Sequence, residues 1–310
     1  MVKKLITAVS SLLFVTMLSF LLMRLSPVDP ATAYVKRNSA IVTEEQITAA
    51  RIELGLDRPL ILQYTDWVAK AIRLDFGISL GTGHPVTREL KKTIPVTFTV
   101  VALSAVIMGV CSILLGLFSW ALHGRIPGML LQVVCMAGIS VPAFYLGTAF
   151  LDFFAIRLKL IQITGNSGIF RYLPIALCLS VSGICFYSQL LAGSLVHEMD
   201  EDYAVYAKCR GLSDLRILFC HALPQALIDL IPSFAQMIGL CLAGAAIVER
   251  VFSLPGLGYL IIDSVMKRDS PVIHAAVLFL ALALVLLDTA AILLQGLLQK
   301  NTNGREADYS

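Results

Sequence analysis

Residue types that carry chemistry are few in this 310-residue chain, and they do not cluster. Motifs that would hold a zinc ion, such as H-E-x-x-H or C-x-x-C, do not occur, and neither does the G-x-x-x-x-G-K-[ST] loop that cradles nucleotide phosphates. The five histidines fall in different segments, namely His84, His123, His197, His221 and His274. We therefore expect no catalytic residues, no metal ligands and no bound cofactor, and an integral-membrane enzyme is a weak hypothesis.

The composition indicates where the chain must fold. Hydrophobic residues make up 57% of it and charged residues only 15%, whereas soluble proteins carry about 25% charged residues. The seven cysteines are odd in number and contain no C-x-x-C pair, so they read as small apolar residues. A soluble enzyme, a disordered protein and a disulfide scaffold are excluded. The net charge of +3 gives no support to nucleic-acid binding.

Six charge-free windows are long enough to cross a membrane as helices, since about 20 apolar residues span about 30 Å of hydrocarbon. They are Leu5–Met23, Thr93–Leu122, Ile126–Leu151, Tyr172–Val196, Leu230–Val248 and Ser270–Leu287, the last continuing to about Gln299. The first window is longer than a signal-peptide core and lacks an A-x-A cleavage site, so we interpret it as a retained anchor. The sequence predicts an all-α membrane protein with six transmembrane helices.

Orientation follows from the basic residues of the short loops. Lys3 and Lys4 place the N-terminus in the cytoplasm, and six crossings bring the C-terminus to the same side. Three basic residues, Arg157, Lys159 and Arg171, fall in a predicted outer loop and oppose this orientation. The resulting division is a first transmembrane helix at 1–25, an external helical cap at 26–92, a transmembrane domain at 93–299 and a cytoplasmic tail at 300–310.

The predicted cap has its own helix signals. Thr43 and Gln46 have capping-box spacing, and Gly55 should end the helix that follows. Pro59 can begin a second helix that ends near Gly77, with Trp67 on its apolar stripe.

Small residues and one proline indicate how the spans pack. Gly109, Ser112 and Gly116 share a face of the second window, which allows close helix packing. Pro142 should kink the third window because it cannot donate a helical hydrogen bond. Asp288 is the one acidic residue clearly inside a window, and we interpret it as interhelical or wetted rather than as part of a proton path.

The polar stretch 198–232 is longer than a connector requires. Asp200, Glu201 and Asp202 should begin a short helix that Lys208 and Arg210 close before Gly211, with acid first and base last as the helix dipole favours. Gly211 can adopt a left-handed cap, and Ser213 can cap a second helix that runs to Pro224. The pattern predicts a helix–turn–helix elbow at the membrane surface. The alternative interpretation, without a functional role, is a surface helix that covers the bundle.

The elbow residues carry a family resemblance. Ala207 to Gly211 and His221 to Pro224 resemble the "EAA" loop of permease subunits of binding-protein-dependent ABC importers, E-A-A-x3-G-x9-I-x-L-P. Val205 and Tyr206 replace its first two residues, and His221 replaces the isoleucine. These departures are similar to the dipeptide/oligopeptide/nickel branch, D-Y-x3-A-x3-G-L-S with a later H-x-L. The implied ATPase-coupling residues are Asp202, Tyr203, Ala207, Lys208, Arg210, Gly211, Leu212, Ser213, His221 and Leu223.

A second motif resembles the same branch. The run from Glu249 to Gly258 reads E-R-V-F-S-L-P-G-L-G, and Arg268-Asp269-Ser-Pro-Val follows it. We expect a tight re-entrant turn outside the membrane with a role in gating, although a rigid turn needed only for folding has nearly equal weight. The possible outer-gate residues are Glu249, Phe252, Pro255, Gly256, Gly258, Arg268 and Asp269.

The resemblance implies one of two permease subunits of an importer in the bacterial inner membrane. Its partners would be a second homologous permease, two ATP-binding subunits that use ATP and magnesium, an extracytoplasmic substrate-binding protein and membrane lipid, with no nucleic acid. The cap sequence from Tyr64 to Ala71 is most similar to nickel or metallophore permeases, so the cargo would be nickel, a nickel chelate or a short peptide. A self-contained secondary transporter or channel is the alternative; it would show matched repeats with broken helices and embedded charges.

Overall fold

The computed structural model describes residues 2–25, 29–38, 42–158 and 168–307. Every regular element in those ranges is a helix, which confirms the all-α prediction. The predictions that touch residues 26–28, 39–41, Lys159 and 308–310 lie outside the described residues. The chain divides into two compact units, which are described separately below. One comprises Met1–Thr97 with Ser253–Val285, and the other Phe98–Phe252 with Leu286–Ser310.

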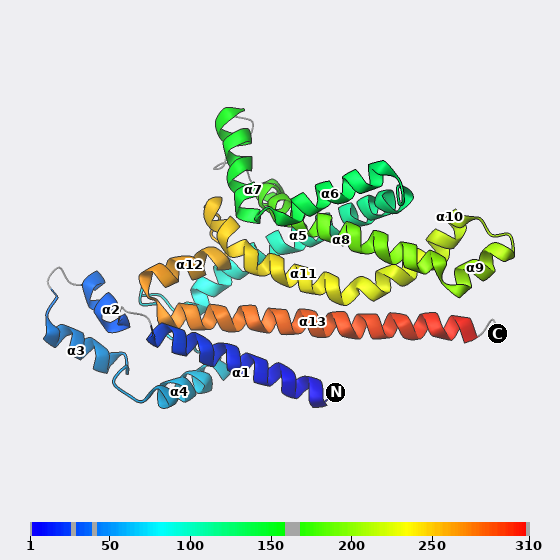
Figure 1. Ribbon diagram of the computed structural model, residues 1–310. Coiled ribbons are helices and arrows are strands. Elements are labelled where there is room, and N and C mark those ends of the chain that lie inside the picture. Colours follow the sequence, from blue (N-terminus) through cyan, green and yellow to red (C-terminus); the bar gives the residue numbers. More distant parts are fainter. Residues whose placement is uncertain (1, 26–28, 39–41, 159–167, 308–310) are drawn as a thin grey trace. The chain divides into compact units, whose positions relative to one another are not determined.

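Five helical stretches are long and apolar enough to cross a membrane (Figure 1). They contain α1 (Val2–Arg24), α5 (Val86–Ala121), α8 (Leu173–Asp200), α11 (Leu223–Val251) and α13 (Ser270–Ala307). All five fall on predicted windows, but α5 begins seven residues before Thr93 and α13 continues beyond Gln299 as one helix. Their apolar lengths, rather than any amphipathic pattern, mark them as spans.

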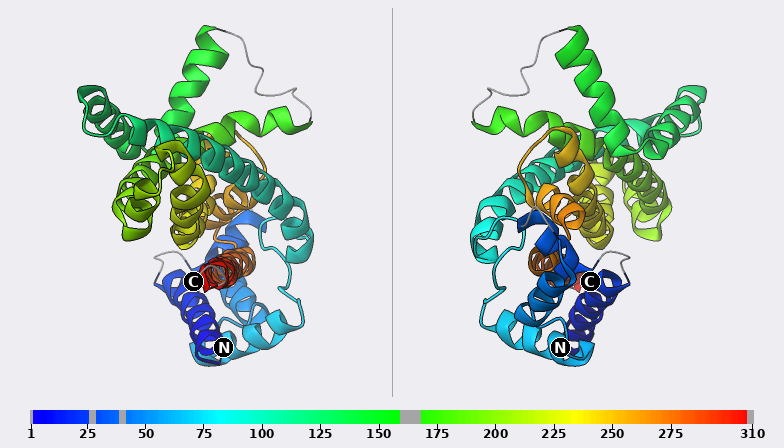
Figure 2. Two further views of the ribbon diagram at one scale, coloured as in Figure 1. Left: turned by 90° about the vertical axis from the view of Figure 1, so that its right-hand side faces the viewer. Right: turned by 90° about the vertical axis from the view of Figure 1, so that its left-hand side faces the viewer.

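The sixth predicted window is a broken helix. It consists of α6 (Ile126–Ser140) and α7 (Ala143–Phe150), which meet at an angle of 91°, and a π-helical turn, η1 (Leu151–Arg157), follows α7. Figure 2 shows the two helices turning away from each other. Pro142 is the N-cap residue of α7, so the predicted break falls where proline removes a helical donor. The count of six crossings therefore holds if this bent pair crosses once.

The first unit holds three short helices between α1 and α5. They are α2 (Pro30–Asn38), α3 (Glu44–Glu53) and α4 (Leu60–Ile72). Thr43 and Gln46 form the predicted capping box at the start of α3, and Gly55 follows its end with a φ of 63°. The carboxylate of Asp29 lies 2.7 Å from the Arg51 guanidinium, and this hydrogen bond raises the pKa of Arg51 above its ordinary value. The Pro59 helix ends at Ile72, earlier than the predicted Gly77.

The same unit contains α12 (Leu257–Lys267) and the first half of α13. Its larger core joins α4, the start of α5, α12 and α13, with Val86, Leu257 and Ala275 completely buried. The Thr97 hydroxyl accepts a 2.7 Å hydrogen bond from the Leu257 amide, so α12 begins at a fixed point on α5.

The second unit is a helical bundle in which α8 and α11 run side by side (Figures 1 and 2). Gly116 lies against Leu191 and Ser188 of α8, and Gly183 lies against Met108 of α5. Both glycines allow neighbouring helices to approach closely. The predicted packing role of the small residues on α5 is confirmed at Gly116. Asp288, on the α13 segment of this unit, is solvent-exposed in the isolated chain.

Candidate functional site

The predicted elbow forms at one end of α8 and α11. It comprises α9 (Asp202–Cys209), a turn at 210–213 and α10 (Asp214–Ile217), and we call residues 202–217 the elbow. Asp202 lies in the first turn of α9 and Lys208 in the last, as the dipole argument predicts, whereas Asp200 is the last residue of α8 and Arg210 follows the end of α9. Lys208 also pairs with Asp214 across the turn at 3.2 Å. The two arms of the elbow are therefore joined by an ion pair as well as by the backbone.

The bend itself depends on Gly211, whose φ is 85°. The amide of Gly211 donates to the Lys208 carbonyl and that of Leu212 donates to the Ala207 carbonyl, which closes α9 in a Schellman-like arrangement. Nothing lies within 4 Å of a Cβ built on Gly211. Glycine is required here by the backbone angle and not by crowding.

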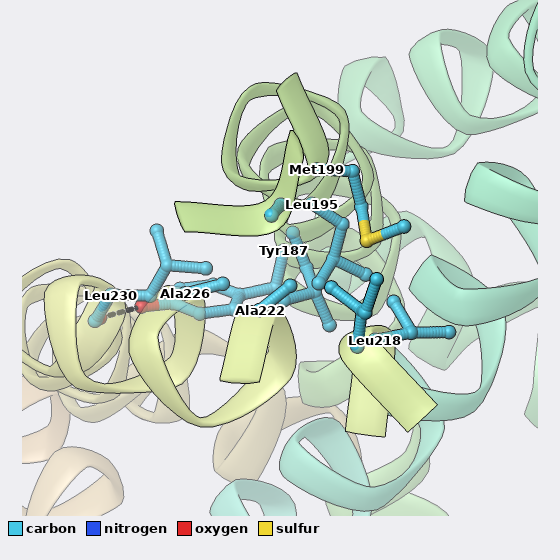
Figure 3. Close-up of a cluster of buried hydrophobic side chains, with 10 residues drawn as sticks. Tyr187, Leu195, Met199, Leu218, Ala222, Ala226 and Leu230 are labelled. Carbon is cyan, nitrogen blue, oxygen red and sulfur yellow. Dashed lines mark hydrogen bonds between the residues drawn. The ribbon is translucent and has the colours of Figure 1, made fainter. Parts of the chain in front are cut away.

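The inner face of the elbow is anchored in a buried apolar cluster (Figure 3). Ala204 and Ile217 are completely buried in it. Figure 3 shows that the cluster joins α8 to the start of α11 through Tyr187, Leu195, Met199, Leu218, Ala222, Ala226 and Leu230. The Tyr187 hydroxyl donates to the Leu230 carbonyl within the cluster. Packed side chains therefore connect the elbow to both long helices.

The outer face of the elbow exposes large apolar side chains. Tyr206 is 65% exposed, Leu215 is 64% exposed and Val205 is also exposed, as is Phe219 just beyond the elbow in η3 (Leu218–Ala222). The Arg210 guanidinium lies 5.7 Å from the centre of the Tyr206 ring. Exposed apolar groups that are rimmed by charges occur at both protein-binding and membrane-binding surfaces. Sequence reasoning noted Val205 and Tyr206 only as departures from a motif, and it missed Leu215 and Phe219.

The second arm differs from its prediction. Ser213 is the N-cap residue of α10, but its side chain makes no capping hydrogen bond. The helix does not end at Pro224, because a π-helical turn, η3 (Leu218–Ala222), precedes this proline and the helix continues into α11. The amide of Leu223 donates to the Leu218 carbonyl in the wider π pattern, and the chain passes the proline without ending the helix. The predicted start of the second helix after Ser213 is confirmed, and its predicted end at Pro224 was wrong.

Other predicted elbow residues have mixed surroundings. Tyr203 donates to the Glu198 carboxylate at 2.8 Å, which ties α9 back to α8, and its ring centre lies 6.5 Å from that of His221. His221 is exposed, whereas Leu223 is half-buried against the apolar cluster. Asp202 and Arg210 are exposed near the turn.

The predicted outer-gate residues fall in both units. Glu249 is buried at the end of α11, and the Phe252 ring lies beside Gly147 and Phe150 of α7. Pro255, Gly256, Gly258, Arg268 and Asp269 belong to the other unit. Gly256 is the N-cap residue of α12, and Arg268 closes that helix in the left-handed region with a φ of 57°. The structure shows a turn followed by a short helix at this point.

Asp269 joins two segments of the first unit by hydrogen bonds. It is buried, and its carboxylate accepts hydrogen bonds from the Ser79 hydroxyl and from the amides of Leu80 and Gly81, the last two at 3.0 and 2.9 Å. These donors belong to the loop before α5, so Asp269 holds that loop against the turn between α12 and α13. Sequence reasoning found Asp269 by its motif but could not identify these partners 190 residues away.

No group of three or more histidine, cysteine, aspartate or glutamate residues is placed to hold a metal ion within the described ranges.

Comparison with known proteins identifies the class of protein. The family described as "Binding-protein-dependent transport system inner membrane component" matches residues 112–304. The family described as "Binding-prot-dependent transport system membrane comp, N-term" matches residues 1–101. The first match covers more than half of the chain, and the chain therefore belongs to the family of binding-protein-dependent transport system inner membrane components.

Individual relatives extend the match over most of the chain. The glutathione transport system permease protein GsiC of Escherichia coli is 30% identical over 287 residues, 93% of each chain. The same holds for GsiC of Shigella boydii. A protein of Sinorhizobium fredii named "Probable peptide ABC transporter permease protein y4tP" is 30% identical over 298 residues, 92% of this chain and 93% of its own length.

Family membership fixes the general role of the chain. It is a multi-pass inner-membrane permease subunit of an ABC transporter, and it is not an enzyme and has no cofactor of its own. A transporter of this kind includes a binding protein, an ATPase and a paired permease.

Proposed function

We propose that this chain forms half of the translocation pathway of an ATP-driven importer and that the elbow is its point of attachment to an ATPase subunit. Two ATPase subunits bind on the cytoplasmic side, a second homologous permease completes the pathway, and a binding protein delivers cargo from outside. The chain's N- and C-termini are cytoplasmic. A self-contained secondary transporter or channel would not need the elbow. That hypothesis leaves both its packed inner face and its apolar outer face unexplained.

The single observation that carries this proposal is the two-faced construction of the elbow. Its inner face is anchored by Ala204 and Ile217 in the cluster between α8 and α11, and its outer face presents Tyr206 and Leu215 to a partner. When the ATPases close, a helix seated in one of them moves as a rigid body. The cluster passes that motion to the two long helices, and the pathway then opens alternately to either side. ATP energy enters through another chain, so a mechanical handle suffices here.

Short peptides, glutathione among them, are the cargo that the relatives support. GsiC is named as a glutathione permease and the protein of Sinorhizobium fredii as a peptide permease. The nickel or nickel-chelate hypothesis rests on the resemblance of the Tyr64–Ala71 segment alone. The binding protein selects the cargo before it reaches this chain, so the permease needs no ligand cluster for either cargo.

We also propose that the turn at 252–258 contributes to passage on the external side. Gly256 begins α12 there, and Phe252, which precedes it in the turn, contacts Gly147 and Phe150 of α7. A Gly256→Ala variant that assembles and hydrolyses ATP but does not import would support this role, and failure to assemble would assign the turn to folding alone.

The cargo proposal is tested by reconstituting the complete transporter in proteoliposomes with its own binding protein. Uptake of labelled glutathione, of a labelled dipeptide and of nickel with a chelator is measured with and without Mg-ATP. We expect ATP-dependent accumulation of one of the first two. ATP-dependent accumulation of nickel alone would overturn the peptide proposal, yet it would leave the role of the elbow intact.

A further inference from the structure

A cavity of about 950 Å³ lies within the first unit, and the established role of the chain does not use it. The cavity is formed where the end of α1, the loops on both sides of α4, and the first turn of α13 come together. Phe20, Tyr34, Trp67 and His274 give it aromatic walls. Cavities of 300–1,000 Å³ with a few polar groups are typical of small-molecule sites.

Two buried donors of this cavity have no partner in the described parts of the chain. They are the indole N–H of Trp67 and the hydroxyl of Ser270, and both residues line the cavity. A buried polar group without a hydrogen bond is costly, so such groups point to a ligand that satisfies them. The indole N–H can only donate, and the hydroxyl can donate or accept, so a ligand with acceptor groups satisfies both.

Charged side chains of both signs also line the cavity. Lys70 lies one turn beyond Trp67 on α4 and is exposed, and Arg58 is held by Asp66 at 3.4 Å. Glu53 and Asp75 also line the cavity and are exposed. A purely anionic ligand would meet the two carboxylates unfavourably. A zwitterion fits better, because its anionic end can bind near Lys70 and Trp67 while its ammonium group faces the acids.

A second, apolar groove adjoins the same tryptophan. It has a volume of about 160 Å³ and is lined by Leu12, Leu13, Thr16, Trp67, Val68, Ala71, Ile72 and Leu278. Trp67 thus lines both the polar cavity and the apolar groove along α1 and α13. A ligand that occupies both spaces must carry a charged head and a hydrocarbon tail.

The contacts of α4 with α1 give the depth of the two spaces. The Tyr64 hydroxyl donates to the Leu13 carbonyl and shares a 2.9 Å hydrogen bond with Thr16, and Leu13 and Thr16 both lie near the middle of the spanning window Ile6–Met23. The groove beside them therefore reaches into the hydrocarbon, whereas the cavity is lined by Phe20 and Met23 near the end of that window, at the membrane interface. The aliphatic side chains of Ile61 and Ile72 on α4 are 75% and 79% exposed, as suits a helix that lies in lipid rather than in water.

We propose that this site holds one zwitterionic aminophospholipid, of the phosphatidylethanolamine class. Its phosphate accepts hydrogen bonds from Trp67 and Ser270 near Lys70, its ammonium group faces Glu53 and Asp75, and one acyl chain occupies the groove beside α1. With the cytoplasmic N-terminus proposed above, the lipid belongs to the outer leaflet. The lipid fills the space between α1, α4 and α13.

The test is a lipid titration of the full-length chain, purified with its paired permease and stripped of lipid. Native mass spectrometry measures the apparent affinity for 1-palmitoyl-2-oleoyl-phosphatidylethanolamine, for the matching phosphatidylglycerol and for glycerophosphoethanolamine, which lacks acyl chains. We expect the phosphatidylethanolamine to bind most tightly. Trp67→Phe and Lys70→Gln should each weaken its binding by about tenfold, as loss of a hydrogen bond to a charged group predicts.

Matched controls are present in the chain. Trp120 is the only other tryptophan, and it lies in the second unit on α5; Lys36 is an exposed lysine of α2 that does not line the cavity. Trp120→Phe and Lys36→Gln should leave lipid affinity unchanged. Trp67→Phe loses packing against Phe20, Tyr64 and His274, so it should lower the melting temperature of lipid-free protein. The informative readout is the rise in melting temperature that the lipid causes, which should be smaller in this variant than in wild type.

Three results would overturn the proposal. The first is equal affinity of phosphatidylethanolamine for wild type and for both cavity variants. The second is equal binding of phosphatidylglycerol, which would remove the zwitterion argument. The third is equally tight binding of glycerophosphoethanolamine or of a dipeptide, which would make the cavity a site for soluble zwitterions. None of these readouts involves transport, so the proposed importer function is tested separately.

Discussion

At the scale of single residues, backbone angle and buried donors decide which positions tolerate change. Gly211 has a positive φ, and nothing lies near the position of its missing Cβ. Asp269, in contrast, accepts hydrogen bonds from three donors. The first residue is needed for the shape of the elbow, and the second for the attachment of one loop. Both effects can be measured with matched variants.

Gly211→Ala should lower the stability of the elbow by about 1–2 kcal/mol, because a side chain disfavours the left-handed region. Transport should fall more than ATP hydrolysis, since a distorted elbow transmits motion poorly. Gly193→Ala is the control, because Gly193 lies in α8 with nothing near its Cβ and no positive φ. Proteoliposome uptake and ATPase rates are measured for both variants. Identical uptake and ATPase rates in the two variants would contradict the role of the Gly211 bend in coupling.

Asp269→Ala should destabilise the protein by about 3 kcal/mol, since it leaves the Ser79 hydroxyl and two amides without their acceptor. Asp263→Ala removes only the exposed pair with Lys267 and should cost less than about 1 kcal/mol. Chemical denaturation of the purified permease measures both. If Asp269→Ala kept full stability but lost uptake, Asp269 would act in the gate rather than in the fold.

At the scale of elements, local signals made some parts predictable and distant contacts hid the rest. Four features depend only on adjacent residues, and all four are confirmed: the capping box at Thr43, the helix ends at Gly55 and Gly211, and the break at Pro142. The sequence did not predict that the helix continues through Pro224, because this depends on a π-helical turn for which no residue pattern is known. The apolar outer face of the elbow was missed because exposure is a tertiary property.

Helix packing around α5 gives an element-scale prediction. A Cβ on Gly116 would lie 2.9 Å from the Leu191 side chain and 3.1 Å from the Ser188 carbonyl, whereas one on Gly109 would meet only Phe234 at 3.4 Å. Gly116→Ala should therefore cost about 1–3 kcal/mol by overpacking, and Gly109→Ala less than half of that. Thermal unfolding of the two variants measures the difference. The reverse order would show that α5 and α8 pack differently.

The cysteines of the elbow region test its outer face directly. Cys209 and Cys220 are the two exposed cysteines of the seven, and the others are buried or partly buried. In membranes that hold the permeases alone, a maleimide should label these two first. Assembly with the ATPases should slow labelling of Cys209 by at least tenfold. Unchanged labelling after assembly would place the ATPase elsewhere on the chain.

At the scale of the whole molecule, the sequence predicted the class of protein better than its cargo. Apolar windows identify spans because the bilayer imposes length and internal hydrogen bonding on any crossing segment. Cargo choice leaves no such signature in a permease when a separate protein captures the solute. The nickel hypothesis depended on a short resemblance in the cap, whereas the relatives that match over 92–93% of the chain are named for glutathione and peptides.

The account as a whole claims that this permease moves solute only when partner ATPases drive its elbow. Accumulation of labelled glutathione or dipeptide is the direct measurement, in proteoliposomes that contain the permease pair and the binding protein, prepared with and without the ATPase subunits. The account predicts accumulation only when the ATPases and Mg-ATP are both present. Equal accumulation in vesicles without ATPases would contradict it and would restore the self-contained carrier.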